Sequence, residues 1–97
     1  MKTILLADDD QYVIEGLLRH VPWEELGVRI AGTAGNGEEA LRLYRELAPD
    51  IVITDIYMPV MDGFELTAAL QDLNPDLPIV FLSGYDDFEN ARKAVQS

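Results

Sequence analysis

The sequence predicts an α/β fold in which helices cover both faces of a doubly wound parallel sheet. Four short apolar runs alternate along the chain with stretches of helical periodicity, and such alternation is typical of parallel strands joined by helical crossovers. Aspartates directly follow the first and the third run, where the carboxyl ends of strands form a binding crevice in such sheets. We therefore predict the strand order 2-1-3-4 within one domain that occupies residues 1–97.

The first two expected strands differ in their patterns. Residues 3–7 are apolar without alternation, which favours a strand buried on both faces. Residues 28–34 alternate instead, which predicts an edge strand with Val28, Ile30 and Gly32 on one face. Residues 12–21 between them have helical spacing. The apolar stripe of that helix is Val13, Leu17, Leu18 and Val21.

Two later helix starts have capping-box spacing, in which an N-cap side chain and a glutamate three residues on each accept from a backbone N–H. Asn36 and Glu39 start one helix, and Asp62 and Glu65 start the other. Each helix is followed by a proline that ends it. The expected stripes are Ala40, Leu43, Tyr44 and Leu47 in the first helix and Leu66, Ala69, Leu70 and Leu73 in the second.

The remaining apolar runs complete the alternating order. Residues 51–54 and residues 79–82 are predicted to be the third and fourth strands. A last helix is expected from near Tyr85. Its apolar face would carry Phe88, Ala91 and Val95.

Composition limits the function. The formal net charge of −11 disfavours nucleic acid and anionic membranes as direct partners of this segment, and it suits divalent cations and basic partners. The absence of cysteine excludes disulfides, thiolate metal sites and cysteine nucleophiles. The apolar run at the amino terminus is too short for a secretory signal or a membrane span, so we expect a cytoplasmic protein.

The candidate site lies where acidic side chains converge. Asp8, Asp9 and Asp10 follow the first strand and Asp55 follows the third, and these strands are neighbours in the expected order. Two charges about 4 Å apart repel by roughly 4 kcal/mol at an effective dielectric near 20, and a bound cation removes this repulsion. An all-oxygen ligand set favours Mg2+ (or Mn2+) over zinc. The alternative is that Asp9 or Asp10 only caps the following helix.

Two further segments are placed near that crevice. Ser83 follows the fourth strand, where its hydroxyl would face the crevice, although it is also a candidate N-cap for the last helix. Met58 and Pro59, followed by Asp62 and Gly63, predict a tight loop from the third strand into a capped helix.

Three segments of the chain resemble the successive blocks of a response-regulator receiver domain of the CheY-like, flavodoxin-like superfamily. They are ILLADDD, DIVITDIYMPVMDG and IVFLSGYDDFENARKA, and they span essentially the whole chain. The resemblance implies that Asp55 is the phosphoacceptor and that Asp8, Asp9 and the backbone carbonyl of Tyr57 hold the metal with it. It implies that Ser83 hydrogen-bonds the phosphoryl group, and that Met58, Pro59 and Gly63 shape the loop.

The same resemblance implies a signalling domain rather than an enzyme. Its partner would be a histidine kinase or a phosphotransfer protein. The segments VPWEELGVRIAGTAGNGEEAL and SGYDDFENARKA are similar to receivers whose full-length members carry an AraC-type helix-turn-helix output domain. DNA binding is therefore expected of a longer parent protein.

The chain departs from the family pattern at its carboxyl end. A complete receiver has a fifth strand and a fifth helix, with a lysine after that strand, and Lys93 lies in the expected fourth helix. We therefore expect a truncated receiver in which metal binding survives and phosphotransfer is impaired. The fourth strand would be left as an apolar edge, which predicts self-association.

Two alternatives have different chemistry. A phosphatase of the haloacid-dehalogenase type uses a D-x-D motif after strand one, which Asp8 to Asp10 contain, but Gln11 and Tyr12 follow in place of its usual Gly-Thr. A non-catalytic interaction module with the same fold is the other alternative. The intact set of Asp8, Asp9, Asp55 and Ser83 argues against it, whereas the missing fifth strand and fifth helix argue for it.

Overall fold

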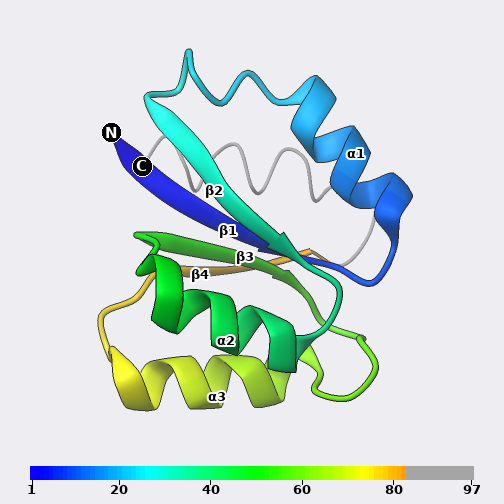
Figure 1. Ribbon diagram of the computed structural model, residues 1–97, viewed down its shortest axis with the longest axis vertical. Coiled ribbons are helices and arrows are strands. Elements are labelled where there is room, and N and C mark those ends of the chain that lie inside the picture. Colours follow the sequence, from blue (N-terminus) through cyan, green and yellow to red (C-terminus); the bar gives the residue numbers. More distant parts are fainter. Residues whose placement is uncertain (83–97) are drawn as a thin grey trace.

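A computed structural model describes residues 1–82, and Ser83 and the expected last helix lie outside these residues. Strands and helices alternate along the described part of the chain (Figure 1). The elements are β1 (Lys2–Ala7), α1 (Gln11–His20), β2 (Val28–Ala34), α2 (Gly37–Leu47), β3 (Ile51–Asp55), α3 (Gly63–Leu73) and β4 (Ile79–Leu82).

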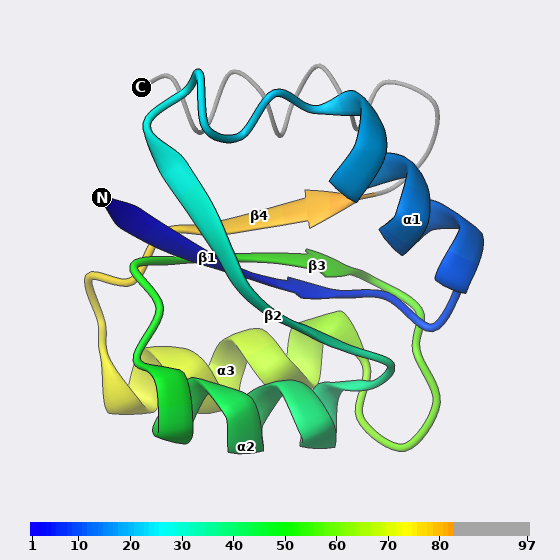
Figure 2. The same cartoon turned by 45° about the horizontal axis from the view of Figure 1, so that its top comes forward.

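The four strands form one parallel sheet of order β2-β1-β3-β4, so the predicted doubly wound topology is confirmed. Helix α1 covers one face of this sheet, and α2 and α3 cover the other (Figures 1 and 2). The chain therefore leaves the neighbouring strands β1 and β3 toward opposite faces. This divergence opens the space at their carboxyl ends.

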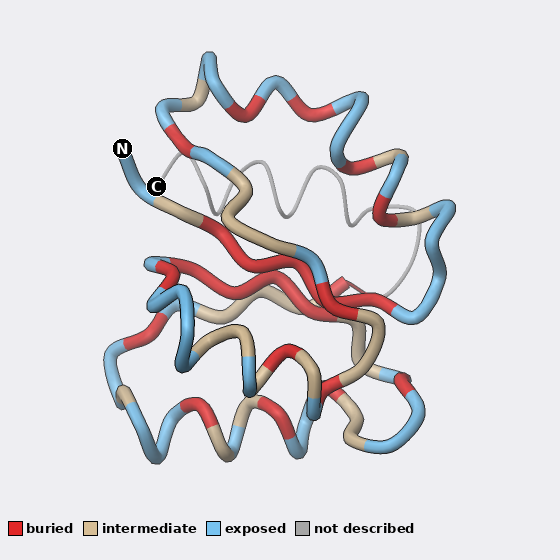
Figure 3. Tube along the Cα trace, in the orientation of Figure 1, coloured by how far each residue is buried: buried red, intermediate tan, exposed pale blue. Residues whose placement is uncertain are grey.

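Apolar residues of β1 and β3 fill the middle of the molecule, and both strands are buried along most of their length (Figure 3). Ile4 and Leu6 of β1 face the α1 side, where they pack with Ile14, Leu17 and Trp23. The alternate residues face the opposite layer and pack on α2 and α3; this second cluster includes Leu5, Ala7, Val52, Ala40, Leu66 and Leu70. The absence of polar alternation in these strands follows from this burial on both faces.

Strand β2 does not alternate as the sequence predicted. Ile4 pairs with Ile30 but Leu5 pairs with Gly32, so the register shifts and Ala31 is an extra residue. Ile30 consequently packs with the α1 side, whereas Gly32 faces Leu5 and Leu47 on the other side. The expectation that Ile30 and Gly32 share a face is wrong, because a β-bulge between them reverses the alternation.

The first helix is also rotated relative to its predicted stripe. Ile14 is buried with Leu17, whereas Leu18 is 43% exposed. Helix α3 matches its stripe better, with Leu66 and Leu70 fully buried. Within residues 1–82, no helix has both the length and the apolar character needed to cross a bilayer.

Candidate functional site

The pairing of β1 with β3 brings the predicted aspartates together. Ala7 lies opposite Thr54 at the end of the ladder, so the next residues, Asp8 and Asp55, emerge side by side. One carboxylate oxygen each from Asp8, Asp9 and Asp55 lie within 4.8 Å of one another. The structure thus brings three of the four candidate carboxylates to one point, although these residues are far apart in the sequence.

The three carboxylates differ in exposure. Asp8 is 4% exposed, Asp55 is half-buried and Asp9 is exposed. The backbone N–H of Asp8 donates to the carbonyl of Ala34 at 3.0 Å, which continues the β1–β2 ladder by one residue. Asp8 is therefore held at the end of the sheet, while Asp9 is exposed to solvent.

Burial of the Asp8 side chain raises its pKa from the ordinary 3.8 to about 6. The N–H of Asp10, which donates to Oδ1 of Asp8 at 2.8 Å, opposes this shift. The negative charges of Asp55, Asp9 and Asp10 raise the Asp8 pKa further. The ionised form of Asp8 is therefore destabilised by lost hydration and by like charges, and a bound cation would offset both effects.

Asp10 has a separate role. Its side chain accepts from the N–H of Tyr12 at 2.9 Å and is the N-cap of α1. The capping alternative thus holds for Asp10 and leaves Asp8 and Asp9 for the cluster with Asp55.

The donor set of the cluster fits a hard divalent cation. All three side chains offer carboxylate oxygens, which suit Mg2+ or Mn2+ and do not suit soft metals. Their oxygens lie within 4.8 Å of one another, so one small cation could contact all three. The residues that would hold it are Asp8, Asp9 and Asp55, with the backbone carbonyl of Tyr57 as the further ligand that the sequence predicts.

The loop between β3 and α3, residues 56–62, is built on internal hydrogen bonds. Thr54 Oγ1 donates to the carbonyl of Asp55 at 2.9 Å, and the N–H of Ile56 donates to Oδ1 of Asp55 at 2.8 Å. Met58 is buried and lies 4.0 Å from Thr54 Oγ1 through its sulfur. These contacts fix the position of the Asp55 carboxylate. Asp55 is half-buried and also interacts with neighbouring groups.

Gly63 closes the loop at the start of α3. Its N–H donates to the carbonyl of Ile56 at 2.7 Å. An added Cβ would collide with the carbonyl oxygen of Asp55 and lie 3.0 Å from Cα of Ile56. Glycine is therefore required where the start of α3 approaches the end of β3.

The exposed tip of the loop contains a conformation that the sequence analysis missed. Val60 has a φ of 70°, in the left-handed region that a β-branched residue rarely adopts. The N–H of Met61 donates to the carbonyl of Pro59 at 2.7 Å across Val60, which makes a strained γ-turn. The side chains of Tyr57 and Val60 are 78% and 72% exposed.

Sequence reasoning also missed Gly37, which contacts this loop from the first position of α2. The available signal was a glycine at the start of a helix, directly after the N-cap, where other residues form helices more readily.

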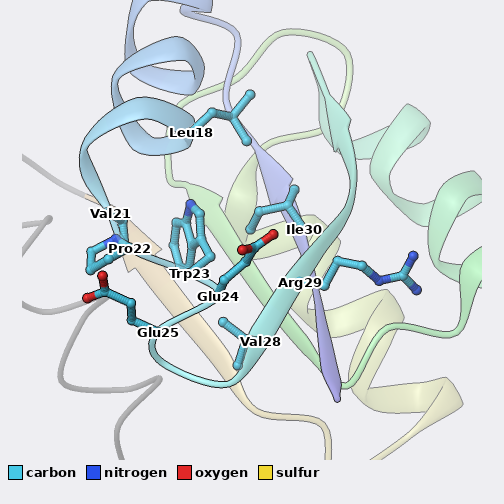
Figure 4. Close-up of a pocket in the computed structure, with 9 residues that line it drawn as sticks. All are labelled: Leu18, Val21, Pro22, Trp23, Glu24, Glu25, Val28, Arg29 and Ile30. Atoms are coloured by element: carbon cyan, nitrogen blue, oxygen red, sulfur yellow. The ribbon is translucent and has the colours of Figure 1, made fainter.

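A hollow of about 440 Å³ lies at the other end of β2, away from the acidic cluster (Figure 4). The Trp23 indole stands in it and donates from Nε1 to the carbonyl of Leu17 at 3.0 Å. This bond ties the segment after α1 to the helix. The lining residues are Leu18, Val21, Pro22, Trp23, Glu24, Glu25, Val28, Arg29 and Ile30.

The fold is that of a flavodoxin-like domain, with a cluster of three carboxylates at the carboxyl ends of its central strands. Residues 4–97 match the response regulator receiver domain family. The chain belongs to this family, and the resemblance stated from its motifs is confirmed.

Individual relatives of the chain are regulators of the same family. The chain is 41% identical over 96 residues to the transcriptional regulatory protein YesN of Bacillus subtilis, covering 99% of this chain and 26% of YesN. It is similar to the crystal structure of a two-component transcriptional regulator AraC from Clostridium phytofermentans, with 34% identity and a TM-score of 0.79, covering 92% of this chain and 72% of that one. This structural likeness agrees with the expected resemblance to regulators of the AraC group.

The chain is also similar to CheY of Borrelia burgdorferi, whose structure was solved in a complex with CheX, BeF3 and Mg2+. It shares 27% identity with a TM-score of 0.77, covering 97% of this chain and 69% of that one. The chain spans 26% to 38% of the length of the first curated relatives that it matches.

Membership of the receiver family also argues against the dehalogenase-type phosphatase that the D-x-D motif suggested. In a dehalogenase-type site both aspartates of that motif would serve the reaction. Here the side chain of Asp10 caps α1 instead.

Proposed function

We propose that this domain accepts a phosphoryl group on Asp55 from a histidine kinase or a phosphotransfer protein, with Mg2+ or Mn2+ held by Asp8, Asp9, Asp55 and the Tyr57 carbonyl. The observation that carries the proposal is the convergence of three carboxylate oxygens within 4.8 Å at the ends of two adjacent strands. Such a cluster is costly without a cation and useful with one.

The proposed step needs little covalent machinery. An oxygen of the Asp55 carboxylate attacks the phosphorus of a phosphohistidine, the P–O bond of an aspartyl phosphate forms, and the P–N bond breaks. The electron pair of that bond returns to the imidazole, which then takes up a proton. A divalent cation supplies charge neutralisation and orientation for such a transfer.

The residues of the chain contribute position. Thr54 and Ile56 hold the Asp55 backbone and carboxylate, and the sheet end holds Asp8. Exposure of Asp9 and partial exposure of Asp55 leave the cluster accessible from solvent, as a donor protein requires. The similar CheY of Borrelia burgdorferi was solved in a complex that contains BeF3 and Mg2+, which supports a divalent cation as a ligand of this domain.

The consequence of phosphorylation lies in the parent protein. Ser83 would hydrogen-bond the new phosphoryl group and relay its presence. The output would be a helix-turn-helix domain of AraC type that binds DNA. The similarity to the Clostridium two-component transcriptional regulator AraC and to the transcriptional regulatory protein YesN supports this output. This reaction cycle belongs to the cytoplasm, where kinases have access to ATP.

Self-association through β4 belongs to the same proposal. Among residues 1–82, β4 pairs with β3 and is an end strand of the sheet. An apolar end strand invites pairing with another chain. Sedimentation velocity over a range of concentrations would show a dimer, and a monomer throughout would contradict it.

Intact-mass measurement after incubation with acetyl phosphate and Mg2+ tests the proposed phosphoacceptor. Asp50→Asn is the matched control, because Asp50 precedes the same strand at its opposite end and Asn keeps the side-chain oxygen that accepts from Thr3. The wild type and Asp50→Asn should gain one phosphoryl group, and Asp55→Asn should not. Equal labelling of Asp55→Asn would refute Asp55 as the acceptor.

A further inference from the structure

We infer that Gly37 is a positioning residue that clamps the β3–α3 loop, residues 56–62, in the shape the acidic site needs. Gly37 is buried at the first position of α2, and the loop residue that it contacts is Met61. Its effect on the site would pass through Met61. The inference deepens the proposed function, because the loop supplies the Tyr57 carbonyl as a metal ligand.

The clamp consists of one hydrogen bond and a backbone contact without spare room. The N–H of Gly37 donates to the carbonyl of Met61 at 2.9 Å. An added Cβ on Gly37 would lie 2.5 Å from that carbonyl oxygen, 2.7 Å from Cγ and 2.9 Å from Cβ of Met61. The nearest of these atoms belongs to the backbone, so the loop itself would have to move.

The helix side of the clamp is firmly held. Asn36 Oδ1 accepts from the N–H of Glu39 at 2.8 Å, and Glu39 Oε2 accepts from the N–H of Gly35 at 3.2 Å. The start of α2 is therefore fixed on both sides of Gly37. The first N–H groups of a helix have no acceptor within the helix, and the Met61 carbonyl satisfies the one from Gly37.

The loop contains a strained backbone conformation at Val60, which the contacts around it must hold in place. Val60, next to Met61, has a φ of 70° in the γ-turn between Pro59 and Met61. A conformation of this kind persists only where its surroundings hold it. Burial of Met58 anchors the loop before Val60, and the bond to Gly37 anchors it after Val60. Tyr57 lies next to the first of these anchors.

Gly37→Ala is therefore expected to displace residues 57–62 and to weaken Mg2+ binding, while the three carboxylates stay in place. Loss of a group that orients metal ligands from outside typically lowers metal affinity by about tenfold or more. Gly35→Ala is the matched control, because a Cβ at Gly35 would meet only Glu39 Oε2, at 3.8 Å.

The experiment is titration of the full 97-residue chain with Mg2+ alone, followed by amide NMR shifts in wild type, Gly37→Ala and Gly35→Ala. The clamp predicts that Gly37→Ala shifts the loop amides before any Mg2+ is added and then binds Mg2+ about tenfold more weakly. Gly35→Ala should match the wild type in both. Unchanged loop shifts and unchanged affinity in Gly37→Ala would overturn the inference.

Hydrogen exchange on the wild type decides the matter if Gly37→Ala does not fold. The clamp predicts that the Gly37 amide exchanges much more slowly than the amide of its exposed neighbour Glu38, and equal rates would refute it. Failure of the proposed function looks different. A wild-type chain that does not bind Mg2+ would defeat the metal site, while the metal-free loop shifts would still test the clamp.

Discussion

Three consecutive aspartates have three different environments, and their chemistry differs accordingly. Asp8 is buried at the end of β1, Asp9 is exposed beside it, and Asp10 caps α1. Asp8 is buried and has three neighbouring carboxylates, and its pKa is raised to about 6. The negative charge on Asp8 therefore lowers the stability of the folded protein when no cation is bound.

This cost predicts how Asp8→Asn changes stability with pH. The folded protein holds the Asp8 proton more tightly than the unfolded chain does, so the contribution of Asp8 to stability falls as pH rises from 3.8 through about 6. Asparagine keeps an oxygen for the Asp10 N–H and removes the charge. Without metal at about pH 7.5, the variant should be more stable by about 1–2 kcal/mol in urea unfolding.

The pH dependence supplies the internal control for that prediction. At about pH 4 Asp8 is protonated in the folded protein, so the gap between the two proteins should nearly close. Urea is preferable to guanidinium because it adds no ions that screen the charges. A variant that is less stable than the wild type at the higher pH would show that Asp8 is not strained.

Residue patterns predicted the acidic cluster but not which aspartate caps α1 and which join the cluster. The motif positions of Asp8, Asp9 and Asp55 sufficed to predict a cluster, because strand order alone makes β1 and β3 neighbours. Which aspartate caps α1 depends on the φ and ψ at the helix start, which the sequence leaves open. The role of Gly37 depends on a contact with Met61, 24 residues away in sequence.

At the scale of elements, two helix starts with the same spacing are built differently. At α3, Asp62 and Glu65 exchange side-chain bonds with each other's backbone and form the full capping box that was predicted. At α2, Asn36 caps Glu39 as predicted, but Glu39 reaches back to Gly35 rather than to Asn36. The spacing predicts both caps, and the local path of the chain decides which N–H the glutamate reaches.

The capping box at α3 gives a prediction about stability. Asp62→Ala removes the acceptor for the Glu65 N–H, which lies 2.8 Å from Oδ1, and should cost about 1 kcal/mol. Asp72→Ala is the control, since Asp72 is exposed in the last turn of the same helix, where a negative charge is unfavourable. Urea unfolding should find Asp72→Ala no less stable than the wild type. Equal losses in both variants would mean that the cap is not the cause.

Strand periodicity was a good guide where burial is uniform and failed where the backbone is irregular. The runs in β1 and β3 identified these strands because both faces are buried. In β2 the bulge at Ala31 lies between two residues assigned to one face. A single extra residue leaves no signature in a seven-residue pattern, so the structure was needed to find it.

At the scale of the whole molecule, the fold places a charged site on a chain that already carries a net charge of −11. Self-repulsion of this size destabilises the compact state, and any cation in solution reduces it by screening. A specific site must therefore show an effect beyond screening. The sole tryptophan, Trp23, is buried beside α1, so its fluorescence reports unfolding of the domain.

Mg2+ titration during urea unfolding tests the central claim most directly. At ten times its dissociation constant, Mg2+ bound to the folded state should stabilise the wild type and Asp50→Asn by about 1.4 kcal/mol, well beyond NaCl of equal ionic strength. Asp55→Asn should lose most of that difference. Equal stabilisation of Asp55→Asn, or an effect that NaCl reproduces in full, would contradict a shared cation site between the ends of β1 and β3.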